Sequence, residues 1–118
     1  QNWSNFTPAK LETLLAGDAP VFTNMTAAWC ITCKVNEKIA LKTETITALF
    51  ANNGIEYLKG DWTNQDSDIT HYLNSFGRQG VPLYVYYGPR NPETGTRPEP
   101  VVLPQLLTAG LVEKTILQ

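Results

Sequence analysis

The chain has 118 residues, of which 42% are hydrophobic and 17% charged, and its formal net charge is −2. This length suits one domain spanning residues 1–118, and the apolar content is too high for a disordered chain. A negative net charge argues against nucleic acid or an anionic membrane as the partner, since both select for excess lysine and arginine. No apolar run approaches the roughly 20 residues that a membrane-spanning helix needs, so we expect no direct membrane insertion.

Helical and extended patterns alternate along the chain, each bounded by caps, glycines or prolines. In chain order we expect a helix from Thr7 to Gly17, a strand at Pro20–Thr26, a helix at Cys30–Leu41, a helix from Thr43 to Asn53, a strand at Ile55–Trp62, a helix from Asp66 or Ser67 to Gly77, strands at Val81–Tyr87 and Val101–Leu103, and a helix from Thr108 to Leu117. The last two strands are joined through Gly88–Pro100, which we interpret as a hairpin connection. This order predicts an α/β fold: a mixed central sheet with helices on both faces.

Both cysteines lie in one motif, Cys30-Ile31-Thr32-Cys33, where a predicted strand gives way to a helix. A zinc site needs about four ligands, and His71 on a predicted surface helix is the only other candidate, so we expect no metal. A purely structural disulfide with two intervening residues would restrain little of the unfolded chain. If both thiols were buried and unreactive, their occurrence together at the start of a helix would be a coincidence.

The motif favours redox chemistry. A thiol in the first turn of a helix meets unpaired backbone N–H groups, which lower its pKa and favour the reactive thiolate. Cys30 lies nearer the helix end, so we expect it to be the nucleophile. Cys33, one turn further, would then resolve the mixed disulfide.

Gly80-Val81-Pro82 begins a predicted strand, an unusual place for proline unless the residue is a simple turn proline or its peptide bond is cis. Together with Trp29-Cys30-x-x-Cys33-Lys34 and the order of elements, this motif resembles the thioredoxin family over nearly the whole chain. The resemblance implies a cis Pro82 packed against the cysteines. It also implies that the backbone of Val81 pairs with an extended partner chain.

Three segments point to one branch of this family: Met25–Glu37, Lys59–Asn64 and Gly80–Tyr84. They are similar to the C-terminal thioredoxin-like domains of the DsbD and ScsB-type thiol:disulfide interchange proteins. That resemblance implies a periplasmic domain that receives electrons from a membrane-embedded domain and passes them to another thiol–disulfide protein. The chain starts at Gln1 without a leader, so we expect a fragment cut from such a membrane protein.

Glu37 and Asn24 are candidates for tuning the thiols. Glu37 follows Cys33 by four residues, where a partly buried carboxylate would oppose thiolate formation; alternatively it is an exposed carboxylate paired with Lys34 or Lys38. The family carries an acidic residue six positions before the first cysteine. Here that position is Asn24, which puts a proton-transfer role for it in doubt.

The pair Ile31-Thr32 contains no His or Pro of the kind that stabilises thiolates in strong oxidants, which favours a reductant. Trp29 is expected to form an apolar rim for partner docking, or else to pack simply at the strand end. No cofactor is implied beyond the redox-active Cys30–Cys33 disulfide. Two alternatives stay open: a disulfide-forming oxidase or isomerase, and a carrier of copper or zinc that would need His71.

Overall fold

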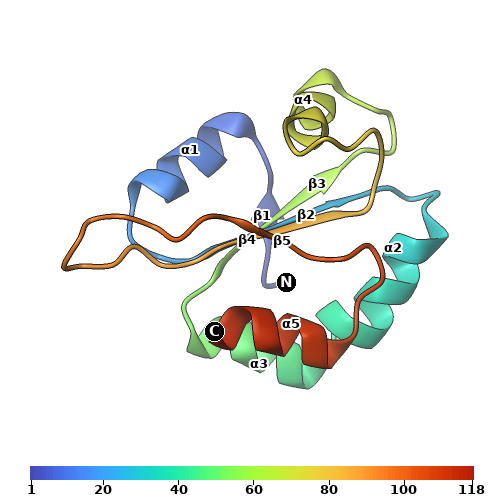
Figure 1. Cartoon of the computed structure of the whole chain (residues 1–118). Coiled ribbons are helices and arrows are strands. Elements are labelled where there is room, and N and C mark those ends of the chain that lie inside the picture. The colour runs from blue at the N-terminus through green and yellow to red at the C-terminus, as the bar shows by residue number, and fades with distance from the viewer.

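The computed structural model describes residues 1–118 and shows a thioredoxin-like α/β fold with a mixed five-stranded sheet and five helices (Figure 1). A short π-helical segment, η1, continues the second helix. In chain order the elements are β1 (Ser4–Asn5), α1 (Pro8–Ala16), β2 (Val21–Thr26), α2 (Ile31–Asn36), η1 (Glu37–Leu41), α3 (Glu44–Asn52), β3 (Glu56–Asp61), α4 (Ser67–Ser75), β4 (Leu83–Tyr87), β5 (Val101–Val102) and α5 (Ala109–Leu117). None of the helices has the length and apolar character that crossing a bilayer demands.

The sheet has the order β1-β3-β2-β4-β5, with β2 at its centre. β2 runs parallel to β3 and antiparallel to β4, and β4 pairs antiparallel with β5. Helices α1 and α4 cover one face, while α2, α3 and α5 cover the other (Figure 1). The predicted mixed sheet with helices on both faces is therefore confirmed, as is the hairpin between the last two strands.

Alternation along β2 divides the core between the two faces. Val21 and Met25 belong to one buried cluster, whereas Phe22 belongs to the other. Successive side chains of a strand point to opposite faces, so a strand buried on both sides carries apolar residues in both registers. Both clusters meet at β2, which ends at the cysteine motif.

The predicted caps are the ones observed. The side chains of Thr7, Thr43, Asp66 and Thr108 each accept a backbone N–H in the first turn of the helix that follows. Two features were not predicted: strand β1, which has only two residues, and the π-helical turn of η1. A two-residue strand carries no periodic pattern, and side-chain spacing does not distinguish one π turn from α-helix.

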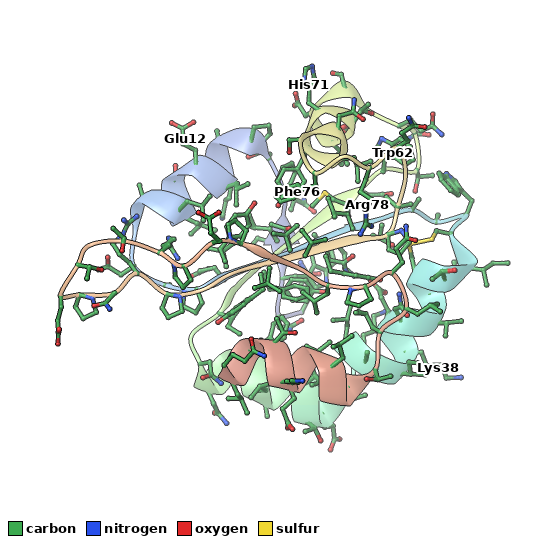
Figure 2. The ribbon with its side chains drawn as sticks, viewed as in Figure 1. Glu12, Lys38, Trp62, His71, Phe76 and Arg78 are labelled. Atoms are coloured by element: carbon green, nitrogen blue, oxygen red, sulfur yellow. A yellow bond between two sulfur atoms is a disulfide. The ribbon has the colours of Figure 1, made fainter.

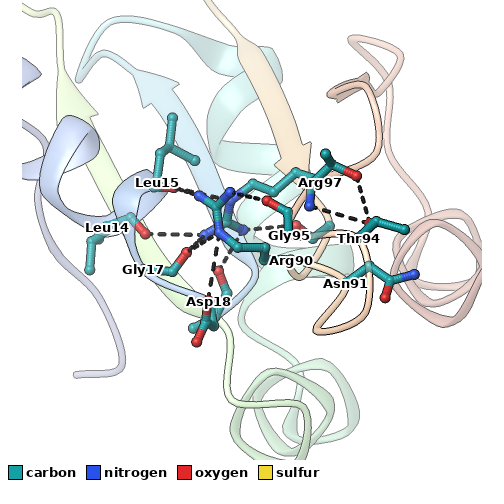
Figure 3. A network of polar contacts seen from close by, with 12 residues as sticks. Leu14, Leu15, Gly17, Asp18, Arg90, Asn91, Thr94, Gly95 and Arg97 are labelled. Carbon is teal, nitrogen blue, oxygen red and sulfur yellow. Dashed lines mark hydrogen bonds and ion pairs between the residues drawn. The ribbon is translucent and has the colours of Figure 1, made fainter.

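The connection between β4 and β5 is tied to the end of α1 by two arginines (Figure 3). Arg97 donates to several backbone oxygens around Gly17, among them Gly17 O itself at 2.6 Å and Ala19 O at 2.7 Å. Arg90 donates to Leu15 O at 2.6 Å. The last carbonyls of a helix lack partners within the helix, and these guanidinium groups supply them.

Candidate active site

The cysteine pair lies where β2 has ended and α2 begins. Cys30 is the N-cap of α2, and its Sγ accepts the backbone N–H of Cys33 at 3.2 Å. The two residues form a disulfide with Cα atoms 5.3 Å apart, visible as the yellow bond at the start of α2 in Figure 2. Cys30 is 8% exposed and Cys33 1% exposed, so Cys30 is the more accessible residue of the two.

Val81 lies against this disulfide and is followed by Pro82. The Val81–Pro82 peptide bond is cis, as the resemblance implied. Val81 packs against the small buried cluster of Ala27, Cys30 and Cys33. Arg78 donates to the carbonyl of Pro82 at 3.3 Å. The fold thus brings together the two motifs that lie far apart in the sequence.

Trp29 directly precedes Cys30 in the loop between β2 and α2. Its side chain is 51% exposed, and its indole N–H donates to the carbonyl of Thr63 at 3.0 Å. Thr63 also accepts the backbone N–H of Ala28 through its hydroxyl at 2.8 Å, and that hydroxyl donates to Asp61. The loop after β3 therefore fixes the loop that carries Cys30. Nothing in the sequence singled out Thr63, because its role depends on the parallel pairing of β2 and β3.

Glu37 is not the exposed carboxylate of the alternative interpretation. It is 15% exposed, and it pairs with Lys59 at 2.7 Å and Lys42 at 3.4 Å rather than with Lys34 or Lys38. Burial by itself raises the pKa of the Glu37 carboxyl, but the hydrogen bonds and charges of Lys59 and Lys42 together lower it below its ordinary value. The carboxylate is thus ionised, and its charge is largely compensated.

Asn24 is wholly buried on β2, on the face that carries α2. Its amide nitrogen donates to the hydroxyl of Tyr57 at 3.0 Å and lies 3.5 Å from Glu37 Oε1. Burial is the main cause that raises the pKa of Tyr57. The amide oxygen of Asn24 has no hydrogen-bond partner. Asn24 is therefore in contact with Glu37, which was not predicted.

Asn36 holds α2 against the rest of the fold and was missed from the sequence. It is 1% exposed; its amide donates to Tyr84 Oη at 2.9 Å and to Gln105 O at 2.6 Å, and it accepts Leu107 N–H at 3.0 Å. A lone asparagine on a helix carries no sequence signal for such a role. Trp62, Tyr84, Tyr86 and Tyr87 are buried.

His71 lies on α4, where it lines an apolar groove of about 450 Å³ between α1 and α4 (Figure 2). The structure forms no group of three histidine, cysteine or carboxylate residues that could hold a metal ion. The histidine that a metal carrier would need is therefore not part of a ligand set with the cysteines.

Comparison with known proteins agrees with this geometry. The family model described as "Thioredoxin-like" matches residues 2–89. The chain is 29% identical over 117 residues to the thiol:disulfide interchange protein DsbD 1 of Pseudomonas aeruginosa. The match covers 95% of this chain and 19% of that protein, so the chain spans about a fifth of the relative's length.

Solved structures share the fold. The oxidised DsbD C-terminal domain of Neisseria meningitidis superposes with a TM-score of 0.65 at 21% identity, covering 95% of this chain and 97% of that one. The Trx4 domain of ERdj5 gives a TM-score of 0.69 at 14% identity, covering 98% and 92%. The Cys30–Cys33 disulfide has the CxxC spacing that thiol–disulfide exchange within one chain requires. The chain belongs to the thioredoxin-like family.

Proposed function

We propose that this domain relays electrons by dithiol–disulfide exchange, as a periplasmic reductant. It would receive two electrons from a membrane-embedded domain and pass them to another thiol–disulfide protein. The observation that carries the proposal is the hydrogen bond from the backbone N–H of Cys33 to Cys30 Sγ. A donor at this distance stabilises negative charge on that sulfur once the disulfide is opened.

The exchange proceeds in two displacements that balance. The Cys30 thiolate attacks one sulfur of the partner's disulfide, forming a mixed disulfide and releasing the first partner thiolate. The Cys33 thiolate then attacks Cys30 Sγ, which restores the Cys30–Cys33 disulfide and releases the second partner thiolate. Two electrons pass to the partner; its two thiolates then take up protons from solvent, which balance the two protons that Cys30 and Cys33 lost on forming their thiolates, and no cofactor takes part.

The residues around the disulfide would orient the partner and tune the sulfurs. The backbone of Val81 would pair with an extended partner segment, and its position beside the disulfide and before the cis Pro82 supports this role. Trp29 offers a half-exposed aromatic surface for docking. Glu37, with Asn24 in contact, would set the local charge near the thiols.

An equilibrium titration against glutathione tests the function and its direction. A reduction potential well below the roughly −120 mV of a strong disulfide-forming oxidant supports a reductant. A potential near that value would reverse the direction to an oxidase. Failure to exchange with glutathione at all would contradict the function itself.

The roles of the two sulfurs can be checked separately. Alkylation of the reduced protein near neutral pH should label Cys30 before Cys33, because Cys30 is the more exposed. Cys33→Ala should accumulate a mixed disulfide with a disulfide substrate, whereas Cys30→Ala should accumulate none. The reverse order would contradict the assignment.

A further inference from the structure

The exposed face of α2 and η1 carries an unusual combination of side chains. Three apolar residues are open to solvent: Ile31 is 78% exposed, Val35 48% and Ile39 50%. They follow one another at intervals of four, so they lie about one turn apart on one side of the helix. Exposed single apolar residues are ordinary, but an exposed apolar row along a helix marks an interaction surface.

Lysines border this row. Lys34, Lys38 and Lys42 are all exposed and recur at the same interval of four. They are three of the nine basic residues in a chain that has 11 acidic ones. The face is therefore a cationic surface on an acidic protein.

No free acidic group interrupts the face. Glu37 is the sole carboxylate between Ile31 and Lys42, and it is 15% exposed and paired with Lys59. A further apolar side chain near α2, that of Leu106, is 74% exposed. Leu106 lies between Gln105 and Leu107, whose backbones are both hydrogen-bonded to Asn36 of α2.

The face is continuous with the disulfide, since Ile31 directly follows Cys30. A partner whose sulfur reaches Cys30 covers the start of α2, and a partner that extends along the helix covers the lysines as well. We propose that this surface, defined as Ile31, Lys34, Val35, Lys38 and Ile39, docks a disulfide-bearing protein segment with carboxylates around an apolar centre. The inference rests on the proposed function and specifies the chemistry of the partner.

Rates of exchange with designed disulfides test the proposal. The reduced protein is mixed with two helical peptides that carry a glutathionylated cysteine; leucines flank it, and the surrounding charges are glutamates in one peptide and lysines in the other. Bis(2-hydroxyethyl) disulfide, which is uncharged and small, reports the intrinsic reactivity of the cysteines. We expect the acidic peptide to react about tenfold faster than the basic one at low salt, with the difference falling as salt rises.

Two variants locate the effect. Lys38→Glu should slow the acidic peptide about fivefold, and Val35→Ser with Ile39→Ser should slow both peptides about fivefold, while the small disulfide reacts at the wild-type rate. The matched control is Lys114→Glu with Leu117→Ser on α5, where both residues are also exposed; it should leave every rate unchanged.

The outcomes separate the two proposals. If the protein fails to react with the small disulfide, the proposed function fails. If it reacts but shows no preference for the acidic peptide, the function stands and the docking surface is overturned. Binding to phosphatidylglycerol vesicles that Lys38→Glu abolishes, without any peptide preference, would overturn the protein partner in favour of a lipid surface.

Discussion

Glu37 and Lys59 form an ion pair of 2.7 Å in which the two side chains are only 15% and 13% exposed. Glu37 comes from η1 and Lys59 from β3, and Lys59 also lies over the ring of Trp3 at 4.7 Å. In the β2–β3 register Lys59 pairs with Asn24, which in turn contacts Glu37. The carboxylate that was expected to act on the thiols is thus itself held by a lysine.

Removing the lysine and removing the carboxylate of this pair should shift the pKa of the Cys30 thiol in opposite directions. Lys59→Met leaves the carboxylate with only the exposed Lys42 as a partner and should raise the pKa of the Cys30 thiol by about one unit, because negative charge disfavours the thiolate. Glu37→Gln leaves the lysine uncompensated and should lower the same pKa. The rate of alkylation of Cys30 against pH measures both, with Lys114→Met as the control. Equal pKa values in all variants would show that the pair is purely structural.

The same ion pair makes the free energy of unfolding depend on pH in the acidic range. The pKa of Glu37 lies below its ordinary 4.5 in the folded protein, so its contribution is present above that value and lost as the pH falls through the folded pKa. We expect the free energy of unfolding of the wild type to fall more steeply below about pH 4.5 than that of Glu37→Gln. Denaturant unfolding across this range measures the difference, and parallel profiles would contradict it.

Asn24→Asp should reverse this pH dependence. The new carboxyl would be wholly buried beside Glu37, and both burial and the neighbouring charge raise the pKa of an acid. Its neutral form is tolerated below about 3.9, the ordinary pKa of aspartate, and stability is lost as the pH rises toward and through the raised folded value. The variant should therefore be less stable at about pH 8 than at about pH 5, relative to wild type.

Asn24→Ala is the control for that measurement. It removes the hydrogen bond to Tyr57 without adding a titratable group, so its cost in unfolding free energy should be the same at both pH values. A pH-independent cost for Asn24→Asp as well would show that the carboxyl ionises without penalty at this position.

Arg97→Ala should destabilise the fold without changing its redox chemistry. The guanidinium donates to four backbone carbonyls around the end of α1 and to the carbonyl of Gly88 after β4 (Figure 3). The four carbonyls around the end of α1 lie before the start of β2, whereas the disulfide follows its end. We expect a loss of about 2 kcal/mol in the free energy of unfolding, since hydrogen bonds to charged groups are among the stronger ones. Arg97→Lys should recover only part of it, because lysine lacks the planar fork. A change in the equilibrium of the Cys30–Cys33 pair with glutathione would contradict the expectation that the contacts of Arg97 do not affect the disulfide.

The elements that the sequence predicted are those with a local cause. Thr7, Thr43, Asp66 and Thr108 cap the helices that follow them, and a cap acts within one turn of chain. The Cys30–Cys33 pair was also predictable from the sequence, because two residues three positions apart at the start of a helix lie close together. The alternative interpretation, in which Glu37 pairs with Lys34 or Lys38, was wrong, because the sequence offers only neighbours on the same helix as candidate partners.

What the sequence determined by itself is the alternating fold, the caps and the CxxC motif at the start of a helix, since backbone preference and apolar period are short-range properties. Tertiary structure decided the rest. It set Val81 beside the cysteines and paired Glu37 with Lys59. It also fixed Trp29 through a hydrogen bond to Thr63, and it buried Asn36 of α2 against the segment that precedes α5. Each of these contacts joins residues from different elements, and only the packing of those elements determines which of them meet.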